Sequence, residues 1–226
     1  MTTAKDLFII ALHLGSPESP VGQGDLSLAL AGAELVDLVT ARAVTLDGDR
    51  VVPEQPTPAV DDRLLAEAAS ALVGQAPYER AEDWLWRRGR ELAAAYQAAL
   101  EEEGALSRGR RGRFTAAAAG VEAADTPARR RALDRWEDGE PTLASLASSV
   151  GVPDGRPEDD TGSGTESAPG FGSDSDGSRV GSAPASDDQA VTTVLLAVGD
   201  AVMELEAVRQ RRAIENAAFA NVWRGP

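Results

Sequence analysis

The sequence has no cysteine, a single histidine (His13), a single lysine (Lys5) and few aromatic residues. Without cysteine, disulfides, thiolate metal sites and cysteine nucleophiles are excluded. His13 lies in an apolar N-terminal segment, where we expect a packed or surface residue and not a catalyst. A cytoplasmic protein is the simplest interpretation of a chain without cysteine.

Long apolar runs and enzyme motifs are also missing. No apolar run reaches the roughly 20 residues that a membrane span needs, because the longest, "VTTVLLAVGDAVMEL", is interrupted by Asp200 and Glu204. The chain has no phosphate-binding loop ending in Gly-Lys-Ser/Thr, and no histidine lies at metal-ligand spacing from carboxylates. We therefore expect no enzyme, no cofactor and no metal site.

What the 226 residues do contain is alanine, leucine and valine at helical spacing. This predicts a mainly α protein with one helical domain, built from residues 1–150 and 191–226. Two small β-hairpins are expected in addition, one around Asp47-Gly48 and one beginning at Ala105. Helices are predicted in residues 3–13, 25–42, 61–73, 78–104 (a helix pair, or one helix loosened at Gly89), 126–150 and 191–226.

Residues 151–190 differ in composition from the rest of the chain. They contain eight glycines, seven serines and four prolines, and nine acidic residues against two arginines. Such a segment cannot bury enough apolar surface to offset its ordering entropy. We predict a disordered acidic insertion, which carries nearly half of the net charge of −15.

Four arginines are concentrated in the stretch "LSRGRRGRF", which we place at the exposed tip of the second hairpin. Guanidinium groups bind phosphate as planar forks, so these side chains suit an anionic partner. A winged-helix nucleic-acid binder with this hairpin as its wing is the third hypothesis, and nucleic acid is an unlikely partner because the net charge is negative even without residues 151–190. The four candidate ligand residues are Arg108, Arg110, Arg111 and Arg113.

The order of segments resembles the Golgi phosphoprotein 3 family, in a bacterial, actinomycete-like version. The resemblance lies in "DLFIIALHLG", "LALAGAELVDLVTARAVTLDGDRVV", "DRLLAEAASAL", "EDWLWRRGRELAAAYQAALEEEGAL" and "VTTVLLAVGDAVMELEAVRQRRAIENAAFANVWRG". It implies a non-enzymatic, mainly helical peripheral membrane protein that binds phosphatidylinositol 4-phosphate. This protein would lie on the cytoplasmic face of a membrane, which is the Golgi membrane in eukaryotic members.

The resemblance also implies a lipid pocket made of one tryptophan and three arginines. By ungapped pairing the tryptophan position falls on Gly22 and the arginine positions on Ala31, Arg90 and Ala93. Arg90 is therefore the expected pocket residue. Arg87 and Arg88, up to one turn earlier, are the arginines that would substitute in part for the missing cations.

Protein partners follow from the same resemblance. Members of the family bind cytoplasmic tails of membrane proteins, and the corresponding hairpin contributes to self-association, which implies a homo-oligomer through residues 105–116. The second hypothesis for this chain is a soluble adaptor or scaffold that binds a protein partner without recognising lipid.

Overall fold

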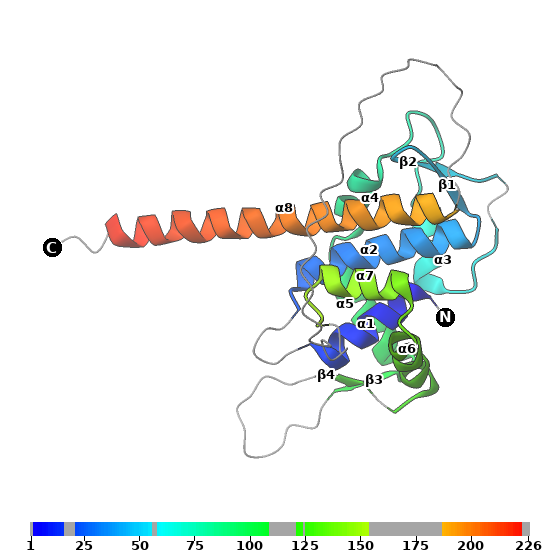
Figure 1. The fold of residues 1–226 in the computed structure, drawn as a ribbon, viewed down its shortest axis with the longest axis horizontal. Helices are drawn as coiled ribbons and strands as arrows, with labels where there is room; N and C mark the ends of the chain where they lie inside the picture. Colours follow the sequence, from blue (N-terminus) through cyan, green and yellow to red (C-terminus); the bar gives the residue numbers. More distant parts are fainter. Residues whose placement is uncertain are drawn as a thin grey trace, which may run out of the picture.

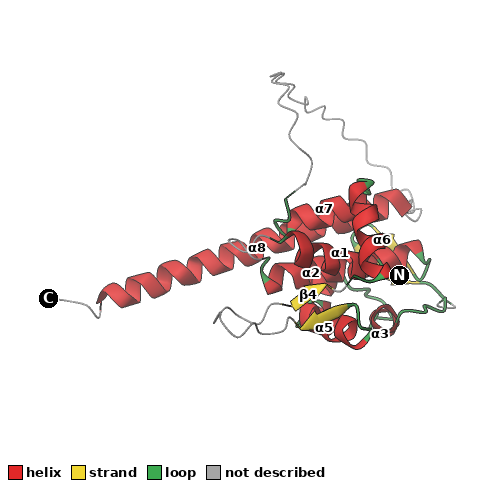
Figure 2. Cartoon of the chain, turned by 90° about the horizontal axis from the view of Figure 1, so that it is seen from below, coloured by secondary structure: helices red, strands yellow, loops and turns green. Residues whose placement is uncertain are grey.

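The computed structural model describes residues 2–15, 21–55, 58–108, 121–123, 125–153 and 187–222. Helices predominate there, and two antiparallel strand pairs accompany them (Figures 1 and 2). The predicted class, a mainly helical domain with two small hairpins, is confirmed. The elements are α1 (Thr3–Leu14), α2 (Gln23–Thr40), β1 (Val44–Asp47), β2 (Arg50–Pro53), α3 (Arg63–Ser70), α4 (Ala81–Arg88), α5 (Leu92–Glu102), β3 (Leu106–Arg108), β4 (Val121–Ala123), α6 (Pro127–Glu137), α7 (Pro141–Ser149) and α8 (Asp187–Val222).

Helix α2 forms the centre of the body and contacts α1, α3, α4, α5, α7 and α8. Every residue from Leu26 to Val39 except Asp37 is buried. A helix that is apolar on all sides is stable only when other elements surround it. Most of the core is therefore built on α2.

The starts of three helices follow from local sequence. The hydroxyls of Thr2 and Thr126 and the carboxylate of Asp62 each accept a hydrogen bond from a backbone N–H three residues further on, at 3.1–3.3 Å. Such N-caps satisfy donors that the first helical turn leaves unpaired. The predicted helix starts at these positions are confirmed, including Pro127 in the first turn of α6.

The first hairpin closes where the sequence predicts it. Asp47 pairs with Arg50, so Gly48 and Asp49 form a two-residue turn in which Gly48 has a φ of +61°. In the second hairpin Leu106 pairs with Ala123 and Arg108 with Val121. Residues 109–120, which include most of the predicted basic tip, lie outside the described residues.

The predicted helix over residues 78–104 is a pair, α4 and α5, separated at Gly89. A β-carbon at position 89 would lie 2.6 Å from the carbonyl oxygen of Leu85 and 3.3 Å from that of Ser27 in α2, so the chain needs glycine at this break. The chain then changes direction at Glu91, whose φ is +56°. This break sets Arg90 apart from the arginines at the end of α4.

The C-terminal segment is one helix of 36 residues, α8, and a continuous helix is what the spacing of apolar residues from Val191 onward predicts. It begins at Asp187, four residues before the predicted boundary, because the two aspartates of its first turn complement the helix dipole. Its buried residues Ala190, Val194, Val198 and Ala201 face the body. Its C-terminal half projects away from the body (Figure 1).

Two ends of the predicted insertion are part of the packed body. Val152 is buried and its N–H donates to the carbonyl of Ala147, and Ala190 is buried in α8. The rest of the predicted insertion, residues 154–186, lies outside the described residues. Among the helices that the structure describes, none has a stretch apolar enough and long enough to cross a membrane.

Candidate functional site

Arg90 is the exposed arginine of the α4–α5 junction. Within the described residues its guanidinium makes no hydrogen bond and no ion pair, and its side chain faces solvent. Gly89 before it packs on Ser27 of α2, and the N–H of Ala93 after it donates to the Ser27 hydroxyl at 3.1 Å. Arg90 is thus held beside the N-terminal turns of α2 with its charge available.

The N-terminus of α2 has no side-chain cap. Its N-cap residue is Gly22, which offers no oxygen to the unpaired N–H groups of the first turn. Uncapped N–H groups and the helix dipole together favour an anion at such a position. The first turn already holds one carboxylate, that of Asp25 close to Gly22, and Arg90 beside these turns is a cation without a described partner.

Arg209 of α8 reaches this site from the other end of the chain. Its Nη1 donates to both carboxylate oxygens of Asp25, at 2.8 and 2.6 Å. A β-carbon at Gly22 would lie 2.2 Å from Asp25 Oδ2 and 3.2 Å from Arg209 Nη2, so this ion pair occupies the space beside that residue. The position that the family resemblance pairs with tryptophan is thus covered by an arginine in this chain. The sequence analysis did not identify Arg209, because no local pattern links residues 184 positions apart.

The other two positions paired with pocket arginines are buried. Ala31 is fully buried in the middle of α2, where its carbonyl accepts a hydrogen bond from Trp84 Nε1 at 3.3 Å. Ala93 is 5% exposed and lies against Ser27. Neither position is on the surface, so the candidate site consists of Arg90, the uncapped turn after Gly22, and Arg209.

Arg87 lies near Arg90 in the sequence but has a partner. Its Nε and Nη2 donate to the two carboxylate oxygens of Glu79, at 2.7 and 2.6 Å, and Nη2 also donates to the Ala71 carbonyl at 3.1 Å. Its guanidinium carbon lies 5.1 Å from the ring centroid of Trp84. The hydrogen bonds to Glu79 raise the pKa of Arg87. In this arrangement Arg87 ties α4 to the preceding loop.

Arg88 is committed to a buried carboxylate. Its Nε and Nη2 donate to Glu34 at 2.7 and 2.8 Å, and the Tyr96 hydroxyl donates to the same carboxylate at 3.1 Å. Glu34 is fully buried, and this burial raises its pKa although Arg88 lowers it. Burial, together with the Glu34 charge, also raises the pKa of Tyr96. This cluster holds α2, α4 and α5 together and leaves Arg88 unavailable to a ligand.

The predicted basic tip can be placed only at its base. The backbone of Arg108 ends β3, whereas Arg110, Arg111 and Arg113 lie outside the described residues. Strand β3 begins four residues after the end of α5. Ala105 and Leu106, at the base of the hairpin, are buried against the body. Self-association through residues 105–116 remains a prediction.

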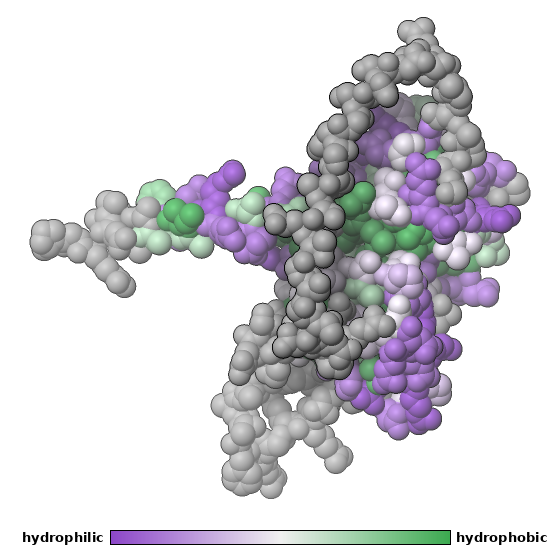
Figure 3. Space-filling view, viewed as in Figure 1, coloured by the Kyte–Doolittle hydropathy of each residue, from purple (hydrophilic) through white to green (hydrophobic). Residues whose placement is uncertain are grey.

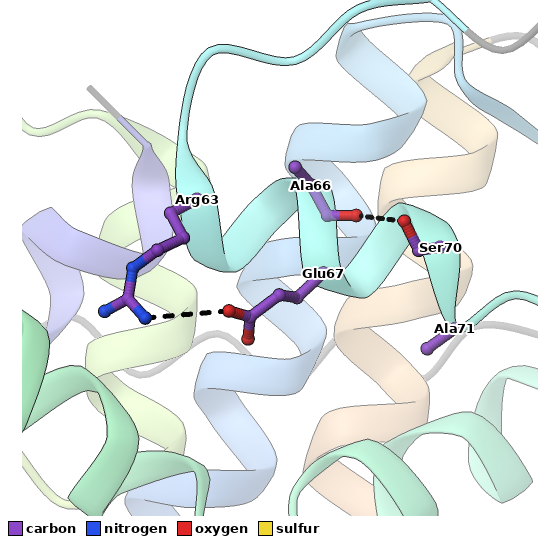
Figure 4. A pocket seen from close by; sticks show the side chains of 5 residues that line it. All are labelled: Arg63, Ala66, Glu67, Ser70 and Ala71. Carbon is purple, nitrogen blue, oxygen red and sulfur yellow. Dashed lines mark hydrogen bonds and ion pairs between the residues drawn. The ribbon is translucent and has the colours of Figure 1, made fainter.

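The described residues contain hollows, but these lack the features of a catalytic or metal site. The hollow in Figure 4, of about 530 Å³, is lined by α3 residues whose polar groups bind one another: Ser70 Oγ donates to the Ala66 carbonyl at 2.8 Å, and Arg63 lies 3.7 Å from Glu67. In the part of the chain that the structure describes, no three histidine or carboxylate side chains are grouped to hold a metal ion. His13, on the exposed end of α1, lies 3.3 Å from Arg129 Nη2.

Comparison with protein families gives one match. Residues 4–164 match the family described as Golgi phosphoprotein 3 (GPP34). The matched range contains Gly22, Arg90 and the second hairpin, and it ends before α8. No curated protein matches the chain.

Proposed function

Because the chain belongs to the Golgi phosphoprotein 3 (GPP34) family, we propose that it is a peripheral membrane protein that binds anionic phospholipid head groups. Phosphatidylinositol 4-phosphate is the proposed preferred lipid, and the cytoplasmic face of a membrane is the proposed location. The protein would act by binding and not by catalysis.

The observation that carries this proposal is the unpaired Arg90 beside an uncapped helix N-terminus. A phosphate group placed there would accept hydrogen bonds from the Arg90 guanidinium, and it would compete with the Asp25 carboxylate for the N–H groups of the turn after Gly22. Arg209, already bound to Asp25, would contribute its remaining N–H donors at the edge of the same site. The nearby Arg87 and Arg88 would not contribute, since Glu79 and Glu34 bind them.

The arginine-rich tip has a separate role in this proposal. Each cation close to an anionic membrane contributes about 1 kcal/mol, without selecting one head group over another. Arg108, Arg110, Arg111 and Arg113 would thus strengthen binding to any anionic surface, while Arg90 would discriminate between head groups.

Sedimentation with liposomes tests the proposal. Vesicles of neutral lipid alone are compared with vesicles containing phosphatidylserine or phosphatidylinositol 4-phosphate at equal surface charge. We expect the wild type to prefer the 4-phosphate lipid, and Arg90→Gln to lose this preference while keeping part of its binding to phosphatidylserine.

Arg42→Gln is the matched control, because Arg42 is also exposed and has no side-chain partner among the described residues, but follows the opposite end of α2. It removes the same charge and should leave the preference unchanged. Equal effects of the two substitutions would mean that binding is purely electrostatic. Absence of binding to every anionic vesicle would contradict the proposal.

The second candidate function is a soluble adaptor that binds a protein partner, such as the cytoplasmic tail of a membrane protein. Two positions that pair with pocket arginines, Ala31 and Ala93, are buried and carry no charge, which favours this candidate. An adaptor would remain in the supernatant with all vesicles, so the same sedimentation experiment separates the two functions.

A further inference from the structure

Helix α8 carries an exposed stripe along the side that faces away from the body. The stripe consists of residues spaced by three or four, which places them on one face of a helix. All six are exposed, and the three large apolar ones are 65–70% exposed. The members of this stripe are Leu196, Asp200, Met203, Ala207, Arg211 and Ile214.

Within the described residues nothing covers the stripe. Asp200 and Arg211 have no hydrogen bond and no ion pair there, and the C-terminal half of the helix projects away from the body (Figure 1). In Figure 3 the projecting part of the helix carries both hydrophobic and hydrophilic side chains. Three large exposed apolar side chains on one face of a helix, with two charged ones between them, indicate a contact surface.

The charges of the stripe are divided between its two halves. Asp200 lies in the N-terminal half of the helix and Arg211 in the projecting half, and both are exposed on the stripe. A second copy of α8 in antiparallel orientation brings the acidic half of each helix to the basic half of the other. A parallel copy brings like charges together, which disfavours it.

The apolar members fit the same antiparallel register. The spacings along the stripe are four, three, four, four and three residues, so the reversed stripe matches the forward one to within one residue. Leu196 then lies opposite Ile214 of the second copy, Asp200 opposite Arg211, and Met203 opposite Ala207. The three kinds of pair are apolar with apolar, acidic with basic, and large with small.

The body supplies a hollow where the second copy would lie. A groove of about 230 Å³ next to the stripe is lined by Leu196 and Asp200 of α8 and by Asp49, Arg80 and Glu82 near the start of α4. Arg80 is bound to Asp49 at 2.6 Å and lies 3.3 Å from Glu82, which leaves the groove acidic. It complements Arg211 of a second copy in charge.

From these observations we propose that the protein forms a symmetric dimer through the stripe of α8, with the two helices antiparallel. Each projecting half lies along the body of the other copy. This surface is distinct from the hairpin of residues 105–116 and from the Arg90 site, so dimerisation does not depend on the proposed lipid function.

Sedimentation equilibrium of the full chain over a range of concentrations tests the dimer. We expect a reversible monomer–dimer equilibrium, and a dissociation constant that rises by about tenfold or more in Asp200→Arg and in Arg211→Asp, because each places like charges opposite one another twice. The double variant exchanges the two charges and should restore the dimer.

Phe219→Ser is the matched control. Phe219 is 68% exposed on the projecting half, but its position lies on a different face from the stripe, so this substitution should leave the dissociation constant unchanged. All four variants change exposed residues, and circular dichroism should confirm an unchanged helical content.

Cysteine cross-linking gives an independent test, because the natural chain has no cysteine. In the antiparallel register two copies of residue 207 are ~6 Å apart along the helix axes and two copies of residue 213 are ~24 Å apart. A short bismaleimide should therefore join two chains of Ala207→Cys and should not join Ala213→Cys.

A wild type that stays monomeric at all concentrations would overturn the proposal. So would a dimer that is indifferent to Asp200→Arg, which would place the contact on another surface such as the second hairpin. A double variant that fails to restore the dimer, or cross-linking of Ala213→Cys, would exclude the register. If Asp200→Arg instead produced monomers that bind anionic vesicles better than wild type, the stripe would be a membrane contact.

Discussion

Charged side chains that are buried in the body have partners, whereas those along the exposed stripe of α8 have none within the described residues. The arginines near the end of α4 show the difference over a short distance. Arg88 forms an ion pair with the buried Glu34. Arg87 forms one with Glu79, in the loop that precedes α4, and Arg90 has no partner among the described side chains. The same residue type therefore stabilises the fold in one position and remains available to a ligand two residues later.

The largest loss in the free energy of unfolding is expected from breaking the buried ion pair between Arg88 and Glu34. Arg88→Met leaves the Glu34 carboxylate without its cation, and such a loss costs about 3–5 kcal/mol. Arg87→Met removes a pair whose arginine side chain is 42% exposed, and should cost no more than about 1 kcal/mol. Urea denaturation of both variants measures the difference. Equal losses of stability in the two variants would show that burial does not determine how much each arginine contributes.

A large effect on binding, but not on stability, is expected at the hairpin tip. Changing Arg108, Arg110, Arg111 and Arg113 to serine should weaken binding to anionic vesicles by up to about 4 kcal/mol. The melting temperature should hardly change if the tip is exposed. Binding by the wild type should also weaken with salt, since the Debye length falls from roughly 10 Å at 0.1 M to about 3 Å at 1 M.

The matched control for the tip replaces the same four arginines with lysine. This variant keeps the charge and should keep most of the binding. If the serine variant binds vesicles as well as the wild type does, the tip has no part in membrane contact and the adaptor function is favoured.

A smaller effect on stability is expected from the ionisation of Asp6. This buried carboxylate has hydrogen bonds at only one of its two oxygens. Its Oδ2 accepts from Arg135, but its Oδ1 is buried without a partner in the described structure. Burial raises the pKa of Asp6 although Arg135 lowers it. The protonated form is thus favoured by folding, so this contribution to stability is fully present below the ordinary pKa of aspartate and is lost as the pH rises through the raised pKa.

Melting temperatures of the wild type and Asp6→Asn between pH 3.5 and 7 test this sign. With rising pH the wild type should lose stability relative to the variant, which cannot ionise at this position. If the wild type instead gained stability relative to the variant with rising pH, the ion pair with Arg135 would outweigh the cost of burial. Asp6 would then behave like the buried charges whose hydrogen bonds are complete.

The smallest effect is expected from removing residues 154–186 and joining the ends with a short glycine-serine linker. The deletion spares Val152 and Ala190, which are packed, and loop closure depends only weakly on loop length. The melting temperature should change little. A large loss of helical signal in circular dichroism would show that this acidic segment stabilises the body.

Local patterns predicted the helices, their caps and the first hairpin, because each depends on residues close in the chain. Thr2, Asp62 and Thr126 cap helices through backbone groups three residues away. The candidate site depends on contacts between distant segments instead. Arg209 meets Asp25 and Arg88 meets Glu34 only after the core has formed, so the sequence could not show which arginines have partners.

The start of α8 is a second feature that the sequence alone did not predict correctly. Asp187 and Asp188 resemble the acidic insertion in composition, and the sequence analysis placed them there. The structure places them in the first turn of a helix, because the apolar residues that follow pack on α2. Composition alone does not separate a solvated acidic residue from one that starts a helix.

The reactivity of the single lysine, Lys5, can report on local unfolding of the segment around α1. Lys5 Nζ lies 2.7 Å from Asp62 and 2.6 Å from Glu103, and its side chain is 9% exposed. Although burial lowers it, the pKa of Lys5 is raised by these two carboxylates, which keep the amine protonated and unreactive. An amine-reactive ester would therefore modify Lys5 only in molecules where α1 has separated from α3 and α5. The rate of acylation at Lys5, followed separately from that of the N-terminal amine, would measure how often that end of the body opens, without any engineered label.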